Sequence, residues 1–332
     1  MDNESLMDDV YFTKILNWYH ENFIERIFTS NDGRPIRYAL QKNSGGKGTV
    51  IVVSGRTEFL EKYLELCWDF RHTGLSLCLY DHYGQGKSGR MLDDPQKGHI
   101  EDFNTYLEDL HNLLTAHVIR KFSPPFFLIT HSMGSTIGTQ FAFEYPELVH
   151  GLILVSPMFQ INTGRFLPPF VVETIISALC FLGGKNSYVP GGGPFRPDLP
   201  FENNVLTSDK RRFELNQALM RNGPDIALGS PTVGWLKQAY LAMRHSRLRA
   251  RQLKCPLLLL QGVNDIVVGS SEMNQFCSAA KHCQMISYPE ARHELLMEQD
   301  VIRSQVLSDI VEFIQSIWIE HEGNHYNEHR YA

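Results

Sequence analysis

Short runs of β-branched and aliphatic residues alternate with amphipathic helical stretches along this chain of 332 residues. Six such runs are expected to be strands buried on both faces, at residues 49–53, 75–80, 126–130, 151–155, 256–260 and 284–288. Strands that alternate with helices form a mostly parallel sheet with helices on both faces. The sequence therefore predicts an α/β fold with such a sheet at its centre.

An antiparallel hairpin is expected ahead of this alternation. Residues 23–41 alternate between apolar and polar side chains on either side of an Asp32-Gly33 pair. Asp-Gly favours the positive φ that a tight hairpin turn needs. A two-stranded ribbon should therefore join the edge of the parallel sheet.

The alternation stops between residues 157 and 252, where Pro-Gly clusters and helical stretches replace strands. We interpret this segment as an inserted helical cap or lid. The predicted division is a first part of the α/β core at 1–156, the cap at 157–252, a second part of the core at 253–320, and a polar C-terminal tail at 321–332.

Composition narrows the classes of partner. The formal net charge of −6 argues against nucleic acid, because phosphate binding requires a dominant basic face. The six cysteines form no Cys-x-x-Cys pair and lie mostly in apolar stretches, so a reduced compartment without structural disulfides is expected.

The polar, acidic N-terminus does not resemble a secretory signal. The longest apolar stretch, residues 166–182, is interrupted by two prolines and Glu173 and falls short of the ~20 apolar residues of a membrane span. We expect a cytoplasmic location, with peripheral contact at the inner membrane face as an open alternative.

The most informative local motif is a buried strand that runs into Ser132, with a helix directly after it. A sharp turn of this kind lifts a nucleophilic serine above the sheet edge and requires small residues nearby. Gly134 meets this requirement, whereas Thr130 stands where a glycine is usual. The alternative interpretation of Ser132 is an ordinary helix N-cap.

A serine hydroxyl needs a histidine to accept its proton and an acid to orient that histidine. Asp265 follows the strand near 257–261, and His293 follows the next strand, at 285–288. Each alone could be an ordinary loop residue. Together with Ser132 they follow the order nucleophile, acid, histidine that this kind of sheet requires, so we predict a catalytic triad.

Acyl transfer also needs backbone N–H groups that stabilise the negative charge on the carbonyl oxygen. We assign these donors to Met133, directly after the nucleophile, and to Arg56, in the loop after the first parallel strand. A plain strand-to-helix turn at Arg56 is the alternative. The glycine-rich loop at 81–89 lacks a third glycine and a helix start, so we interpret it as a structural loop bordering the site.

These motifs together resemble the α/β-hydrolase superfamily, specifically its bacterial lysophospholipase L2 and monoacylglycerol lipase branch with a serine aminopeptidase S33-type hydrolase domain. The residues that carry the resemblance lie at 54–58 with Tyr63, at 81–88, at 131–134, and at Asp265 and His293. The resemblance implies hydrolysis of a carboxylic ester of a lipid, a lysophospholipid or a monoacylglycerol, without metal or cofactor. Thr130 and Ser54 depart from the usual pattern of the family.

The proposed cap offers modest support for a lipid substrate. Its apolar residues at 166–172 and 175–182 could bind an acyl chain or rest on a bilayer, or they could be ordinary cap core. Four arginines follow, and they are either a solvated helix face or a contact for anionic head groups: Arg244, Arg247, Arg249 and Arg251. Three histidines spaced four apart, His321, His325 and His329, could bind Zn²⁺ but are expected to be a polar tail.

Three functions remain open at this point. The first is a serine esterase that acts on a lipid, and the second is a peptidase or small-ester hydrolase of the same fold. The third is a non-catalytic protein that binds a ligand on a hydrolase scaffold. The sequence leaves the head group, the acyl chain length and the oligomeric state undetermined.

Overall fold

The computed structural model describes residues 10–163, 168–223 and 225–330. Within this part of the chain an eight-stranded sheet has the order β1-β2-β4-β3-β5-β6-β7-β8. Its strands are β1 (Ile24–Thr29), β2 (Pro35–Gln41), β3 (Thr49–Val53), β4 (Ser76–Tyr80), β5 (Phe126–His131), β6 (Gly151–Val155), β7 (Leu257–Gly262) and β8 (Cys283–Tyr288). From β4 to β8 all neighbours are parallel, which confirms the predicted sheet.

The predicted hairpin is also present. β2 pairs antiparallel with β1 on one side and with β4 on the other. Gly33 adopts a φ of 83° in the turn, and the N–H of Ser30 donates to the carbonyl of Arg34 over 2.8 Å. The positive φ explains why glycine occupies this position.

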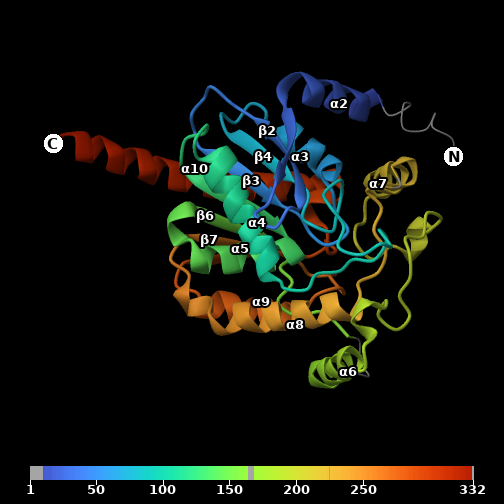
Figure 1. Cartoon of the computed structure of the whole chain (residues 1–332). Helices are drawn as coiled ribbons and strands as arrows, with labels where there is room; N and C mark the ends of the chain where they lie inside the picture. Colours follow the sequence, from blue (N-terminus) through green and yellow to red (C-terminus); the bar gives the residue numbers. More distant parts are fainter. Residues whose placement is uncertain (1–9, 164–167, 224, 331–332) are drawn as a thin grey trace.

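Two hydrophobic cores cover the two faces of the sheet, because successive strand residues point to opposite sides. Ile51 and Val53 belong to one core, and Val50 and Val52 belong to the other. The first face is covered by α4 (Asn104–Leu113), α5 (Met133–Glu144), α8 (Val233–Leu248) and α9 (Ser270–Ala279). The second is covered by α2 (Val10–Asn22), which no sequence pattern above predicted, α3 (Leu64–Phe70) and α10 (Asp300–Arg330) (Figure 1).

The segment 157–252 divides between a projecting part and the core. Its helices α6 (Pro169–Phe181) and α7 (Lys210–Asn222) lie outside the layers that cover the sheet (Figure 1). Its last helix, α8, instead packs on α5, where the Gln140 side-chain amide donates to the carbonyl of Ala242 over 2.9 Å. The projecting part therefore ends before α8, earlier than the boundary expected from the sequence.

Two expectations from the sequence were wrong. The polar tail was predicted for residues 321–332, but α10 continues through Gly323 to Arg330, and no proline interrupts it (Figure 1). A disulfide joins Cys277, near the end of α9, to Cys283, the first residue of β8. The tight turn between the two elements brings their Cα atoms to 5.4 Å, a proximity that the spacing of the cysteines did not reveal.

None of the helices in the described ranges combines the length and the apolar character needed to cross a lipid bilayer. Among the same residues, no cluster of His, Cys, Asp and Glu has the arrangement of a metal site. The cytoplasmic location and the absence of a cofactor remain predictions.

Candidate active site

Ser132 occupies a strained turn between β5 and α5. Its backbone has φ 50° and ψ −112°, a conformation that non-glycine residues rarely adopt. A Cβ on Gly134 would collide with the carbonyl oxygen of Val53, so the turn can pack against the end of β3 only because residue 134 is glycine. This is the strand-turn-helix geometry that the sequence predicted for a nucleophilic serine.

Thr130 fits beside this turn because its neighbours provide space and hydrogen bonds. Its hydroxyl donates to the carbonyl of Ile153 over 2.8 Å and lies 2.9 Å from Ser135 Oγ. A Cβ on Gly138 would lie only 2.7 Å from Thr130 Cγ2, so a glycine at 138 leaves room for the threonine side chain. The departure from the usual glycine at 130 is thus matched by a glycine one helical turn into α5.

Ser132, His293 and Asp265 lie in one hydrogen-bonded line. The Nε2 atom of His293 is 3.0 Å from Ser132 Oγ, and its Nδ1 atom is 2.7 Å from Asp265 Oδ2. The side chains of His293 and Asp265 are 4% and 3% exposed. The structure therefore brings together all three residues that were predicted to form a triad.

Backbone groups hold Asp265 in this orientation. Its Oδ1 atom accepts hydrogen bonds from the N–H groups of Val267 (2.7 Å) and Val268 (3.3 Å), which leaves Oδ2 facing the imidazole. The carboxylate follows β7 and the imidazole follows β8, two parallel neighbours whose carboxyl ends meet at the same edge of the sheet. The order of the strands accordingly brings residues 28 positions apart into contact.

Two backbone N–H groups, one in the loop after β3 and one directly after Ser132, have no hydrogen-bond partner among the described residues. In the loop after β3, the N–H of Gly55 donates to the Glu58 carboxylate and that of Thr57 to Gln85 Oε1. Across the described residues, the N–H groups of Arg56 and Met133 take part in none of the hydrogen bonds. These are the two donors assigned from the sequence.

The proposed oxyanion loop, which we define as residues 54–58, packs against the turn that carries the serine. A Cβ on Gly55 would lie 2.9 Å from His131 Nδ1, so the loop lies directly against the residue before Ser132. The glycine-rich loop supports it from behind, since Gln85 Nε2 donates to the carbonyl of Gly55 over 2.8 Å. Residues 81–89 therefore border the site as a structural loop, as expected.

Two buried polar residues of the glycine-rich loop complete this support. His82 Nε2 donates to the carbonyl of Ser54 over 2.9 Å, and burial lowers the pKa of His82 to about 4, which keeps the ring neutral. Asp81 accepts from the N–H groups of Leu60 (2.7 Å) and Lys87 (2.9 Å). Burial raises the pKa of Asp81 to about 6.

A buried network that the sequence did not predict lies behind the triad. Its centre is Glu58, whose Oε1 atom is 2.9 Å from His131 Nδ1 and whose Oε2 atom accepts from the Tyr63 hydroxyl over 2.6 Å. The other ring nitrogen of His131 lies 3.3 Å from the carbonyl oxygen of His293. Both nitrogens of His131 thus face acceptors, as they would in a protonated ring.

Lys62 extends the network to the loop that carries His293. Its ammonium group lies 2.9 Å from Glu58 Oε1 and 2.6 Å from Glu294 Oε1. Two positive groups, His131 and Lys62, then neutralise the carboxylates of Glu58 and Glu294 inside the protein. The sequence signal that was overlooked is the spacing of four between Glu58 and Lys62, together with the position of Glu294 directly after His293.

The pKa shifts follow from this pairing. Burial alone would raise the pKa of Glu58, but the charges of His131 and Lys62 outweigh it and hold that pKa well below its usual range. Burial opposes the protonated form of His131, yet the Glu58 carboxylate raises the pKa of His131 above its ordinary value. The network is therefore held together by charge in the neutral pH range.

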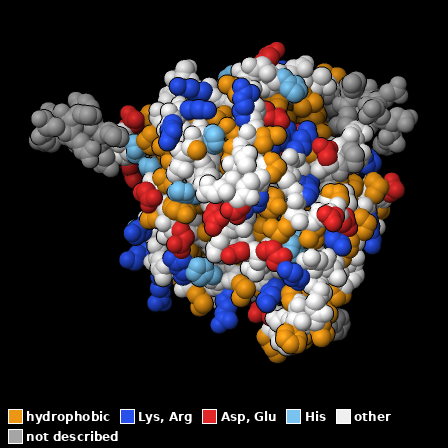
Figure 2. All heavy atoms as spheres, in the orientation of Figure 1, with side chains coloured by type: hydrophobic (Ala, Val, Ile, Leu, Met, Phe, Trp, Pro, Cys, Tyr) orange, Lys and Arg blue, Asp and Glu red, His pale blue; other side chains and the backbone are white. Residues whose placement is uncertain are grey.

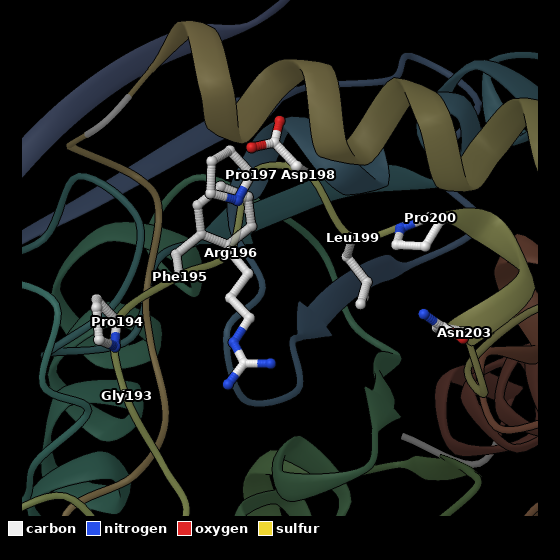
Figure 3. Close-up of a pocket in the computed structure, with 9 residues that line it drawn as sticks. All are labelled: Gly193, Pro194, Phe195, Arg196, Pro197, Asp198, Leu199, Pro200 and Asn203. Atoms are coloured by element: carbon white, nitrogen blue, oxygen red, sulfur yellow. The ribbon is translucent and has the colours of Figure 1, made fainter.

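A pocket of about 480 Å³ lies in the segment before α7, lined by residues 193–200 and Asn203. Figure 3 shows the Arg196 side chain extending into its centre. The segment is anchored at one end by Ser230, whose N–H donates to the carbonyl of Gly193 over 2.8 Å. At the other end the carbonyl of Asn204 accepts from Arg292, the residue before His293, so the segment extends to the loop of the triad histidine.

The four arginines near the end of α8 do not form one free basic face. Arg247 donates to the carbonyl of Phe159, and Arg249 pairs with Glu144, whereas Arg244 and Arg251 are exposed. The ring of His321 contacts that of His150 at 5.6 Å between centroids. The side chains of His325 and His329 lie outside the described residues, so the zinc alternative stays untested.

Comparison with known proteins identifies a family and several relatives of this chain. The family model described as serine aminopeptidase, S33, matches residues 45–300. Lysophospholipase L2 of Escherichia coli is 34% identical over 297 residues, which cover 87% of this chain and 86% of that protein. A monoacylglycerol lipase of Mycolicibacterium smegmatis is 25% identical over 273 residues, covering 81% of this chain and 89% of that protein.

The fold also agrees with solved structures. A thermostable carboxyl esterase from Bacillus coagulans superimposes with a TM-score of 0.71 at 23% identity, over 90% of this chain and 99% of that one. The residues that the family model matches include strands β3 to β8, the turn at Ser132 and the two loops that carry Asp265 and His293 in order. The chain is therefore a hydrolase of the serine aminopeptidase S33 family, within the α/β-hydrolase superfamily.

Proposed function

We propose that this protein is a serine hydrolase that cleaves the carboxylic ester of a lysophospholipid through an acyl-enzyme intermediate. One observation carries the proposal: the imidazole of His293 lies within hydrogen-bond distance of both Ser132 Oγ and Asp265 Oδ2. A serine becomes an effective nucleophile only when a base in this position accepts its proton.

The reaction proceeds in two halves. Ser132 Oγ attacks the ester carbonyl while His293 Nε2 takes its proton, and Asp265 stabilises the imidazolium that forms. The N–H groups of Arg56 and Met133 stabilise the negative charge on the carbonyl oxygen. The intermediate collapses, the alcohol leaves with the proton of His293, and the acyl group stays on Ser132. Water, deprotonated by His293, then releases the fatty acid and restores the serine hydroxyl.

The relatives support a lipid ester as substrate. A protein named lysophospholipase L2 matches this chain at 34% identity across nearly its whole length, and a monoacylglycerol lipase matches at 25%. We favour the lysophospholipid because of the higher identity. Monoacylglycerol hydrolysis is the second candidate, and a small ester or peptide is the third.

The test is a substrate panel with the purified full chain. A p-nitrophenyl ester series of increasing acyl length is run beside lysophosphatidylcholine and monoacylglycerol that carry one common acyl chain. Ser132→Ala is the control and is expected to abolish release of fatty acid from all of them. Faster hydrolysis of monoacylglycerol than of lysophosphatidylcholine would select the second candidate. Turnover by Ser132→Ala at the wild-type rate would reject the serine mechanism.

We also propose peripheral contact with a lipid surface through α6. Phe170, Phe181 and Leu182 are 69%, 91% and 80% exposed, and apolar side chains gather on this projection (Figure 2). Exposed apolar patches of this kind mark interaction sites, and a lipid substrate resides in a membrane. Phe181→Ser is expected to weaken co-sedimentation with phosphatidylglycerol vesicles, whereas Ile27→Ser, an exposed change on β1, is not. Equal sedimentation of both variants and wild type would count against contact through α6.

A further inference from the structure

Among the described residues, the partly buried guanidinium of Arg56 has no carboxylate partner. Other buried cations of this protein form ion pairs, such as Arg37 with Glu61 and Lys62 with Glu294. Among the described residues Arg56 forms no ion pair, and its identified hydrogen bond goes to the carbonyl oxygen of Gly229. Burying an uncompensated charge costs free energy, so its presence calls for an explanation.

The donors of this guanidinium are only partly used. Its Nε atom is buried and has no hydrogen-bond partner within the described part of the chain. The group lies over the ring of Trp235, with 5.2 Å between Cζ and the ring centroid. Burial lowers the pKa of Arg56 to about 10, so the side chain remains positively charged at neutral pH.

The backbone of Arg56 fixes where this charge is located. The preceding residue, Gly55, packs against His131, and the N–H of Arg56 is the proposed donor to the ester oxygen. The guanidinium therefore lies within the length of one arginine side chain of that N–H, between the carbonyl of Gly229 and the ring of Trp235. In a lysophospholipid only the glycerol backbone separates the ester from the phosphate. The phosphate of a bound substrate would therefore lie at a similar distance from the ester carbonyl.

We propose that the Arg56 side chain binds the phosphodiester of the substrate's head group and thereby favours phosphate-bearing lipids over neutral monoacylglycerols. A guanidinium presents planar, paired donors that match the oxygens of a phosphate, and hydrogen bonds between charged groups are the stronger ones. Within the described ranges, the unpartnered Nε and the lack of a carboxylate beside the guanidinium are both consistent with this role. The inference rests on the proposed lysophospholipase function.

A purely structural role would have a different signature. Through Gly229 and Trp235 the guanidinium also connects the oxyanion loop to the start of α8. A residue that only holds these elements together would affect every substrate equally, whereas a phosphate ligand affects lipids according to their head group.

The experiment measures kcat/KM for three lipids that carry the same lauroyl chain in identical mixed micelles: lysophosphatidylcholine, lysophosphatidylethanolamine and monoacylglycerol. For each lysophospholipid, we take the ratio of its kcat/KM to the kcat/KM of the monoacylglycerol. Arg56→Gln is expected to lower this ratio by roughly 10- to 100-fold. Arg56→Lys, which keeps the charge but not the planar fork, should recover part of that ratio. Arg251→Gln removes an exposed charge elsewhere and should leave the ratio at its wild-type value.

The outcomes separate the two proposals. If wild type cleaves the lysophospholipids and Arg56→Gln loses the same factor on all three lipids, the head-group role is overturned while the lysophospholipase function stands. If wild type cleaves only the monoacylglycerol, the lysophospholipase function fails and this inference fails with it. Because Arg56→Lys keeps the charge, its ratio provides the test even if Arg56→Gln proves unstable.

Discussion

The Nδ1 atom of His131 lies 2.9 Å from Glu58 Oε1, although the two residues are 73 positions apart in the chain. This contact joins the loop that carries one proposed oxyanion donor to the residue before the nucleophile. Through Lys62 the same carboxylate also reaches Glu294, the residue after His293. One buried acid thus connects the three loops on which the proposed reaction depends, so that they can keep a common geometry.

Glu58→Gln should therefore impair turnover without removing any group that touches the substrate. We expect kcat to fall by roughly 10- to 100-fold with a smaller change in KM, because displaced catalytic groups act mainly on the transition state. The midpoint of thermal unfolding should also fall, since Lys62 and His131 lose a buried counter-charge. Steady-state kinetics and thermal denaturation measure both effects.

Glu61→Gln is the matched control, because Glu61 lies three residues after Glu58, in the short helix Leu60–Tyr63, and pairs with Arg37 rather than with His131. It should leave kcat close to that of wild type. If Glu58→Gln had the kcat of wild type, the network would have no positioning role.

The His131–Glu58 pair predicts a pH dependence of stability. The pKa of His131 is raised above its ordinary value of 6.5, so its contribution is fully present below that value and is lost as the pH rises through the raised pKa. The pKa of Glu58 is lowered from 4.5, so its contribution is present above that value and is lost as the pH falls through the lowered pKa.

The pair should therefore stabilise the fold most between these two ordinary values. Urea unfolding of wild type and His131→Gln at pH 6 and at pH 9 tests this expectation. The difference in unfolding free energy between the two proteins should shrink at pH 9. A difference that grows with pH would contradict the charged pairing of His131 with Glu58.

The packing of Thr130 against Gly138 predicts a coupling between the two positions. Gly138→Ala should destabilise the protein by about 1–3 kcal/mol, because the new Cβ would lie 2.7 Å from Thr130 Cγ2. In a Thr130→Gly background the same change should be close to neutral or stabilising, since alanine favours a helix. A double-mutant cycle by chemical denaturation measures the coupling, and additive effects would argue that the two positions do not contact each other.

The Cys277–Cys283 disulfide predicts a modest sensitivity to reductant. Closing a short loop, with a sequence separation of 6, stabilises a fold by about 2 kcal/mol in the chain-entropy model. Dithiothreitol should accordingly lower the midpoint of thermal unfolding of wild type but not that of a Cys277→Ser/Cys283→Ser double variant. Alkylation of both thiols without reductant, seen by mass spectrometry, would show that the bond is absent.

The sequence was sufficient for the sheet and for the spatial arrangement of Ser132, Asp265 and His293 because both depend on local patterns. Buried strands are readable as apolar runs; Ser132 directly follows one, and Asp265 and His293 lie in the loops after two others. Because the carboxyl ends of neighbouring parallel strands lie at one edge of the sheet, the three side chains then lie close together. The strained turn at Ser132 was likewise expected from the small residue at Gly134.

The remaining features depend on contacts across the fold. Lys62 and Glu294 are separated by 232 positions, and no local pattern indicates that they meet. Thr130 departs from the usual glycine, and it fits only because Gly138 lies beside it. That fit depends on the packing of a strand against a helix, which no local pattern indicates. The placement of α8 in the core and the Cys277–Cys283 bond likewise depend on tertiary structure.

The central claim is that His293 activates Ser132. Its most direct test is the rate at which a fluorophosphonate probe labels the native protein, followed by mass spectrometry of the labelled peptide. Wild type should carry the adduct on Ser132 alone, and His293→Ala should label slower by about 10³-fold or more. Adduct formation elsewhere, or labelling of His293→Ala at the wild-type rate, would contradict it.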